Sequence, residues 1–368
     1  MTTTATDLAQ LPLLRPAVFG DLALSNRIML APTTRCRADN PELAPTERHA
    51  AYYAQRAGAG LVVTEGTWIS EEAIGYVHVP GCWSAAQLDG WRRVTTLVHA
   101  HGGRILLQLW HAGAVSHPDH HGGELPLGAS AVAPDQQVFT PTGPKPAPVP
   151  RPMTPADLGR TIDAYRTAAL NARAAGFDGV ELPALGFSLL GQFLDPWLNR
   201  RTDGYGGDRA SRRRLLLEVI AAVAGAWPGE RRTGVRIGPW LAAGTDPDAA
   251  ERLAEDCAEL ATVLNGHPLA YLHVRGPEVD APDFSAFARY RERFEGPLIA
   301  NLGFDGETGN AVIESGLADA VSYATHFIAN PDLVTRLALG LALTPSDPAT
   351  HYQGGARGYL DQGFADYA

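Results

Sequence analysis

Two polar side chains lie within short apolar runs of this sequence, where each of them needs a partner. Gln108 interrupts an apolar run that starts at Ile105, and Arg236 lies between two β-branched residues. A buried carboxamide is costly unless its oxygen and its nitrogen are both hydrogen-bonded, and a buried guanidinium requires an anion or a polarised carbonyl. The edge of a planar heterocycle would satisfy such groups.

Both residues also have a structural explanation. Gln108 could hydrogen-bond the neighbouring backbone, and Arg236 could form a salt bridge with Glu65 or Glu181. A function is therefore favoured only if further groups meet these two at the same place.

Thr34 and Gly66 add a hydroxyl and a close approach of the backbone, neither of which is informative alone. An amide, a guanidinium, a hydroxyl and a glycine that meet at one place suit the pyrimidine ring of a flavin. The arginine would stabilise negative charge at N1 and C2=O of the reduced ring, and the threonine would adjust its potential from the O4 side. We therefore predict a flavin site, provided that the fold brings these residues together.

The elements that must position these residues alternate between strands and helices. Short apolar runs alternate with longer, alanine-rich segments, which is the pattern of parallel strands joined by crossover helices. Eight strands are predicted, at 27–34, 60–66, 104–110, 179–183, 234–239, 270–276, 297–302 and 320–324. They favour an α/β fold with a single (β/α)₈ (TIM) barrel over an open, doubly wound sheet, because the first βα turn lacks a GxGxxG sequence.

In such a barrel the chemistry lies at the C-terminal ends of the strands. The residues at those ends are Thr33, Thr34, Glu65, Gly66, Gln108, Trp110, Pro183, Arg236, His273, Arg275, Leu302, Gly303, Ala324 and Thr325. The last two strands and the short helix after them commonly bind phosphate through backbone N–H groups. Here that phosphate site would comprise Leu302, Gly303, Ala324 and Thr325.

Two loop excursions, after the third and fourth strands, exceed the repeat. Residues 113–153 are rich in Pro, Gly and His, and we expect a loop with a short hairpin where barrel enzymes build lids. Residues 186–208 form the second excursion. The whole chain, 1–368, is interpreted as one domain, with the barrel at about 14–343 and a tail at 344–368 that could fold over the site.

Composition excludes several other classes of function. A net charge of -10 disfavours a nucleic-acid surface, and no segment has the pattern of a signal peptide or the roughly 20 apolar residues of a membrane helix. The cysteines form no CxxC pair, and the histidines around the long loop are interpreted as solvated, so no metal site is predicted: Cys36, Cys82, Cys257, His111, His117, His120 and His121. We expect a cytoplasmic protein that acts on a small molecule and could form a homo-oligomer.

Five segments, in order along the chain, resemble the old yellow enzyme family of FMN-dependent ene reductases. They are NRIMLAPTTR (26–35), QLWH (108–111), AGFDGVEL (175–182), NRRTDGYGG (199–207) and IANPDL (328–333). The resemblance implies FMN as cofactor and NAD(P)H as reductant. It places at the FMN ring Pro32, Thr33, Thr34, Gly66, Gln108 and Arg236, and on the substrate side Tyr76, Trp110 and Tyr359.

The substrate anchor of that family is missing here. Family members reduce activated alkenes, with an HxxH or HxxN pair after the fourth strand that grips the substrate oxygen and a tyrosine that donates the proton. This chain has Pro183 and Gly186 at the positions of the pair and Ser188 at that of the tyrosine. Proline and glycine side chains cannot donate a hydrogen bond, and serine is a far weaker acid than tyrosine. Loss of one such donor costs about 10²- to 10³-fold in rate in other enzymes.

The phosphate corner also departs from the family, which commonly has Gly-Arg where this chain has Ala324 and Thr325. A charge-assisted contact to the phosphate is lost, although backbone amides and the Thr325 hydroxyl remain. His326 could compensate, or it could be a surface histidine at the start of a helix.

Three functions are open on this basis. The first is a flavoenzyme of specialised metabolism with a rebuilt substrate pocket, which could reduce, desaturate or isomerise its substrate. Leu185 and Phe187 would make this pocket more apolar, and Tyr76 or Ser188 would be catalytic. The second is an ordinary ene reductase with a substitute anchor such as His111 or His273. The third is a flavin-free barrel that binds a ligand or catalyses a non-redox step.

Overall fold

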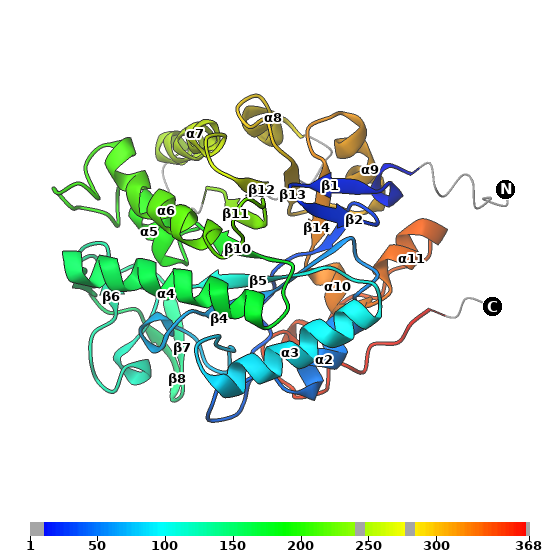
Figure 1. Cartoon of the computed structure of the whole chain (residues 1–368), viewed down its shortest axis with the longest axis horizontal. Coiled ribbons are helices and arrows are strands. Elements are labelled where there is room, and N and C mark those ends of the chain that lie inside the picture. Colours follow the sequence, from blue (N-terminus) through cyan, green and yellow to red (C-terminus); the bar gives the residue numbers. More distant parts are fainter. Residues whose placement is uncertain (1–10, 240–246, 277–283, 366–368) are drawn as a thin grey trace.

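The structure, a computed structural model, describes residues 11–239, 247–276 and 284–365, and its centre is a closed barrel of parallel strands (Figure 1). The barrel strands are β3 (Ile28–Leu30), β4 (Leu61–Trp68), β5 (Ile105–Trp110), β10 (Gly179–Pro183), β11 (Thr233–Ile237), β12 (Leu269–Arg275), β13 (Leu298–Asn301) and β14 (Ala320–Tyr323). β14 pairs with β3 and closes the barrel. The predicted fold class is confirmed, and each predicted strand coincides with one barrel strand.

Helices surround the barrel on its outer side. They are α2 (Glu47–Ala54), α3 (Ala85–Ala100), α4 (Pro155–Ala174), α5 (Leu189–Leu194), α6 (Arg209–Ala224), α7 (Pro247–Leu264), α8 (Ser285–Arg291), α9 (Gly306–Glu314), α10 (Thr325–Ala329) and α11 (Leu333–Leu339). Capping residues define where several of them begin. Thr154 accepts a hydrogen bond from the Asp157 backbone at the start of α4, and Asp208 accepts one from Ser211 at the start of α6.

An apolar cluster closes the barrel at the N-terminal ends of its strands. The cluster includes a β-hairpin that we did not predict from the sequence. Strands β1 (Ala17–Phe19) and β2 (Leu22–Leu24) pair antiparallel and pack Phe19 against residues of the barrel interior. The hairpin lies beside β13 and β14 in Figure 1. Because the apolar cluster fills this end, polar groups that bind a ligand must lie nearer the opposite, C-terminal ends of the strands.

The two predicted loop excursions have local structure of their own. The first contains the predicted hairpin, β7 (Gln137–Thr140) with β8 (Gly143–Pro146), and a second pair, β6 (Leu127–Gly128) with β9 (Arg151–Pro152). The second contains α5. Arg201 in the second excursion donates to the carbonyl oxygens of Ala129 and Met153 in the first, at 3.0 and 2.7 Å, so the two excursions support one another.

The chain after α11 returns to the barrel as a tail that lies beside α2 (Figure 1). Its one regular turn is a short 3₁₀ helix, Pro348–Thr350, in the described part of the tail. Within the described ranges, no helix is long and apolar enough to span a membrane. Residues 1–10, to which the expectation of no signal peptide refers, lie outside the described residues.

Gly191→Ala should destabilise the protein although alanine favours helices. A Cβ at Gly191 in α5 would lie 2.0 Å from the Leu185 carbonyl oxygen, so loop and helix must separate. We expect a loss of about 1–3 kcal/mol, measured by denaturant unfolding. The control is Gly159→Ala on exposed α4, where a Cβ meets nothing within 4 Å and a gain of about 0.5–1 kcal/mol is expected. Equal effects of the two substitutions would contradict this packing.

Candidate active site

A network of buried polar side chains crosses the barrel interior above the apolar cluster. Glu181 on β10 is its centre, and it accepts hydrogen bonds from Gln108 Nε2 at 2.8 Å, the Tyr271 hydroxyl at 3.0 Å and His273 Nδ1 at 2.9 Å. Gln108 lies on the neighbouring strand β5, whereas the other two come from β12, beyond β11. Contacts between strands that are not neighbours show that these side chains point into the barrel.

Gly234 on β11 makes the longest of these contacts possible. β11 separates β10 from β12, and a Cβ at Gly234 would lie 2.2 Å from Cζ of Tyr271. The tyrosine ring can therefore pass over β11 to Glu181 only because the intervening residue is glycine. This role of Gly234 was not predicted from the sequence.

The hydrogen bonds fix the charge of Glu181 and the tautomer of His273. His273 Nδ1 donates to Glu181, and its Nε2 lies 2.8 Å from Ser322 Oγ, so a neutral imidazole satisfies both partners. Burial lowers the pKa of His273, in keeping with the neutral form. Burial alone would raise the pKa of Glu181, but His273, the Arg236 charge and the Gln108 hydrogen bond lower it, so the group is a carboxylate.

Arg236 is placed by Asn301, and its buried Nε has no partner among the described residues. Its Nη2 donates to Asn301 Oδ1 at 2.6 Å, and the Asn301 amide donates to the Ser322 carbonyl at 3.1 Å. No ion pair joins Arg236 to Glu181 or Glu65, the two partners that we considered for it. Its Nε is buried and has no hydrogen-bond partner among the described residues. A buried N–H of this kind is costly and requires an acceptor, as the flavin interpretation supposes.

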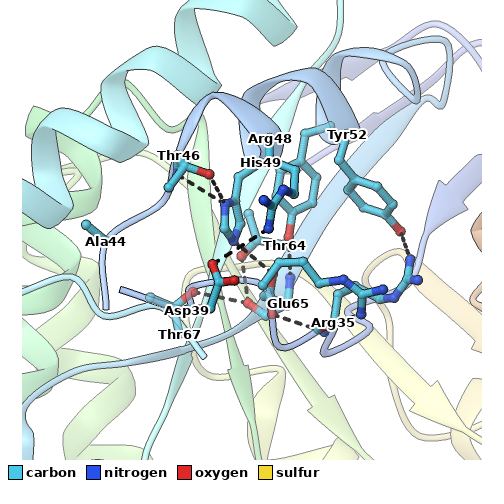
Figure 2. A network of polar contacts seen from close by, with 12 residues as sticks. Arg35, Asp39, Ala44, Thr46, Arg48, His49, Tyr52, Thr64, Glu65 and Thr67 are labelled. Carbon is cyan, nitrogen blue, oxygen red and sulfur yellow. Dashed lines mark hydrogen bonds and ion pairs between the residues drawn. The ribbon is translucent and has the colours of Figure 1, made fainter. Parts of the chain in front are cut away.

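A bulge in β4 separates Glu65 from the interior network. The register of β4 against β5 shifts between Val63 and Gly66, and Glu65 faces α2 (Figure 2). Its Oε2 accepts a hydrogen bond from the Arg35 backbone at 3.1 Å, and its Oε1 lies 4.0 Å from His49 Nε2. Bulges redirect side chains in this way, and the alternating pattern of a regular strand could not reveal it.

The residues that we predicted to border the flavin at β3 and β4 are Pro32, Thr33, Thr34 and Gly66. Pro32, Thr33 and Thr34 directly follow β3 and are half-buried. At Gly66, a Cβ would lie 2.5 Å from Cε3 of Trp110, so glycine is needed here to seat the tryptophan. We had explained Gly66 by a close approach of a ligand, and packing is a sufficient cause.

The predicted phosphate corner is formed by the ends of two paired strands, β13 and β14. Leu302 has φ +100° and Gly303 has φ +77°, while Ala324 and Thr325 follow β14. Such a φ is strained for leucine, and strained backbone of this kind clusters at ligand-binding sites. Gly303 and Thr325 are exposed, so the corner is accessible.

Aromatic rings line the side predicted to face the substrate. Trp110 lies between Trp68, at 4.3 Å between ring centroids, and Phe187, at 5.7 Å. Tyr76 packs on Phe139 of the β7–β8 hairpin at 4.9 Å. Burial raises the pKa of the Tyr76 hydroxyl, and the nearby Cys36 and Tyr352 raise it further.

The structure buries Tyr359 between the tail and α2. Its side chain is fully buried, stacked on Tyr52 of α2 with 4.1 Å between centroids, and its hydroxyl has no partner among the described residues. Tyr359 is therefore not exposed in this structure, and its place on the substrate side stays a prediction. Tyr352 of the same tail, by contrast, is 55% exposed and is near enough to Tyr76 to be one of the groups that raise its pKa.

Ser188 has a structural role and is corrected as a catalytic candidate. Its hydroxyl is buried, donates to the carbonyl oxygens of Pro183 and Leu185 at 2.7 and 2.8 Å, and caps α5 through the Gly191 backbone. The serine proton is thus committed to the backbone. Pro183 and Gly186 are buried beside it and offer no side-chain donor, as predicted from their types.

The two proposed substitute anchors are both buried, and of their ring nitrogens only His111 Nε2 has no partner among the described residues. His273 has both ring nitrogens committed, and His111 is only 1% exposed, with Nδ1 accepting from the Gly113 backbone at 3.0 Å. Burial lowers the pKa of His111 to about 3, so it is neutral. In the long loop, His117 Nδ1 lies 3.0 Å from Asp119 Oδ1, so this histidine is paired with a carboxylate as well as near solvent. In the part of the chain that is described, no group of three or more His, Cys, Asp or Glu side chains could hold a metal ion.

The fold and the site together define a TIM-barrel oxidoreductase that binds a flavin. The family model described as "NADH:flavin oxidoreductase / NADH oxidase family" matches residues 12–344. The chain belongs to this family, which confirms the resemblance to old yellow enzymes. It is therefore a flavin-dependent oxidoreductase, with FMN as cofactor and a nicotinamide nucleotide as reductant.

Relatives with named activities match over nearly their whole lengths. The "Probable flavin mononucleotide-dependent alkene reductase" of Leishmania infantum is 37% identical, over 96% of this chain and 97% of the relative. The "12-oxophytodienoate reductase 1" of Oryza sativa subsp. japonica is 36% identical, over 97% and 94%. The solved structure of morphinone reductase in complex with tetrahydroNAD superposes with a TM-score of 0.89 and 41% identity, covering 96% of this chain and 98% of that one.

Glu65 should make stability depend on pH. Burial raises the pKa of Glu65 from its ordinary value of 4.5 to about 7. Between these values the folded protein holds a proton that the unfolded chain releases, so stability falls as pH rises through this window, by on the order of 3 kcal/mol. Denaturant unfolding from pH 4 to 8 should show this slope in the wild type and a flatter one in Glu65→Gln. An unchanged slope in Glu65→Gln would show that other groups cause it.

Proposed function

We propose that this protein uses FMN and NAD(P)H to reduce a carbon–carbon double bond of a small molecule from specialised metabolism, in a pocket rebuilt relative to its family. The observation that carries the proposal is the buried Arg236 Nε, which has no partner among the described residues. Desaturation or isomerisation of the same kind of substrate would use the same site. Three free, buried cysteines support a cytoplasmic location.

The residues present fit the pyrimidine side of FMN. Gln108 is held by Glu181 through one N–H, which leaves its carbonyl oxygen and its second N–H for a ring edge. Arg236 would use its Nε donor, and Pro32, Thr33, Thr34 and Gly66 would border the ring. At the other end, the phosphate would lie at Leu302, Gly303, Ala324 and Thr325, where backbone amides replace the arginine of the family. Bound FMN would accept hydride from the nicotinamide and deliver it to the alkene.

The substrate side is apolar and lacks a donor at the family's anchor position. We infer that Trp110, Phe187, Pro183 and Gly186 border the substrate and bind it by shape more than by hydrogen bonds. Tyr76 is the proposed proton donor, because the Ser188 proton is committed to the backbone. Its hydroxyl holds its proton at neutral pH, and because burial raises its pKa, it is a weaker acid here than an exposed tyrosine.

The two alternative functions have less support. An ordinary ene reductase needs a substitute anchor, and both histidines considered for it are buried. The ring of His273 is held by hydrogen bonds, and that of His111 is enclosed. A flavin-free barrel would leave the Arg236 Nε without an acceptor in the interior. Family membership also disfavours it.

Arg236→Ala should weaken FMN binding about 10- to 100-fold, because a charge-assisted hydrogen bond contributes about 1.5–3 kcal/mol. The purified wild type should be yellow and release FMN on acid treatment, and the affinity can be measured by fluorescence titration of the apoprotein. The matched control is Arg231→Ala, an exposed arginine just before the opposite end of β11, which should leave the affinity unchanged. A colourless protein that takes up no FMN would overturn the proposed function.

A further inference from the structure

Five carbonyl oxygens of the C-terminal tail converge on one buried guanidinium. Arg37 is 1% exposed, and its three nitrogens donate to the tail. The acceptors are the carbonyl oxygens of Thr350 at 2.7 Å, His351 at 3.0 Å, Gly355 at 3.2 Å, Arg357 at 3.2 Å, and Gln353. The tail is thus wrapped around this side chain.

Arg35 makes a second set of contacts with the same segment. Its Nη2 donates to the Gly358 carbonyl at 2.7 Å, its Nε to the His351 carbonyl at 2.9 Å, and its Nη1 to the Tyr52 hydroxyl at 3.1 Å. The guanidinium groups of Arg35 and Arg37 lie over the ring of Tyr359, at 5.2 and 5.1 Å from its centroid. We call the pair Arg35 and Arg37, with tail residues 350–359, the arginine clasp.

The clasp satisfies charges and carbonyl groups that would otherwise be costly. Neither arginine forms an ion pair with a described residue, and arginine cannot lose its proton in a protein, so carbonyl dipoles and π faces must balance both charges. Apart from one 3₁₀ turn, the tail has no helix or strand between 350 and 359 to satisfy its own carbonyls. The tail and the two side chains therefore depend on each other for their conformation.

The clasp directly adjoins the flavin side of the mouth. Arg35 follows Thr34 in the chain, and its backbone N–H donates to Glu65 at the bulge of β4 (Figure 2). Figure 2 also shows the Arg35 guanidinium turned toward Tyr52 of α2, away from Glu65. Residues 33–37 thus present threonines to the flavin side and arginines to the tail.

The tail also brings an exposed tyrosine close to Tyr76, the proposed proton donor. Tyr352 lies between residues whose carbonyls bind Arg37, and it is near enough to Tyr76 to be one of the groups that raise the pKa of that hydroxyl. Loss of the clasp would release this wall of the mouth without removing any group that touches the flavin ring.

We propose that Arg35 and Arg37 are positioning residues that hold tail residues 350–359 as one wall of the mouth, and so set the affinity for the molecule that meets the flavin. The proposal rests on the proposed function for the identity of the site, and its tail contacts stand apart from it. Lysine cannot replace Arg37, because three donors on one nitrogen cannot reach five carbonyls arranged around a planar fork.

Arg37→Lys tests the clasp while retaining the charge. We expect faster amide hydrogen exchange over residues 350–360 and an apparent Kd for NADPH at least 10-fold higher in anaerobic flavin reduction, with the FMN affinity within 2-fold of wild type. The matched control is Arg357→Gln, an arginine of the same tail whose side chain is 74% exposed in an ion pair with Asp347; it should change none of these. Unchanged exchange and unchanged NADPH affinity in Arg37→Lys would overturn the proposal.

Gly358→Ala disturbs the clasp from the tail side and serves if Arg37→Lys fails to fold. Gly358 has φ +64°, and a Cβ there would lie 2.1 Å from Thr350 Oγ1. It should weaken NADPH binding in the same way, with FMN affinity retained; normal NADPH binding would overturn the proposal. If the wild type binds no FMN, the proposed function fails, whereas the exchange rates of the tail still test the clasp.

Discussion

A buried carboxylate that accepts three hydrogen bonds inside the barrel is the interaction on which the rest of the site depends. Glu181 could not remain charged in an apolar interior without these donors and the Arg236 charge across the network. In return it fixes the orientation of Gln108 and the tautomer of His273. The arrangement leaves the buried Arg236 Nε without a described partner, and we propose that FMN supplies its acceptor.

The surrounding structure closes the barrel to water at the N-terminal ends of its strands and leaves the C-terminal ends accessible. The N-terminal hairpin and the apolar cluster form the closed end, while strained or exposed backbone at the ends of β13 and β14 forms the accessible end. The mouth is then completed by segments outside the barrel strands: the two loop excursions and the clasped tail. We therefore propose that the barrel residues bind the cofactor, and that the loop excursions and the tail select the molecule that reaches it.

Most of the fold, and FMN as the cofactor, could be predicted from the sequence because they rest on local signals. The strands were predicted from apolar runs, and Gln108 and Arg236 were conspicuous as polar residues within those runs. What could not be predicted depends on contacts between distant segments. The passage of Tyr271 over Gly234, the bulge that turns Glu65 toward α2, the capping role of Ser188 and the burial of Tyr359 leave no periodic pattern in the chain.

The central claim is that Glu181 holds Gln108 in position for FMN and balances the charge of Arg236. The FMN affinity of the Glu181→Gln apoprotein tests this claim most directly. The amide removes the charge that balances Arg236 and supplies a donor where Gln108 or Tyr271 already donates. We predict an FMN Kd raised at least 10-fold, with Tyr271→Phe, which leaves the Gln108 contact in place, having a smaller effect. A Glu181→Gln protein that folds normally and binds FMN as tightly as wild type would contradict the account.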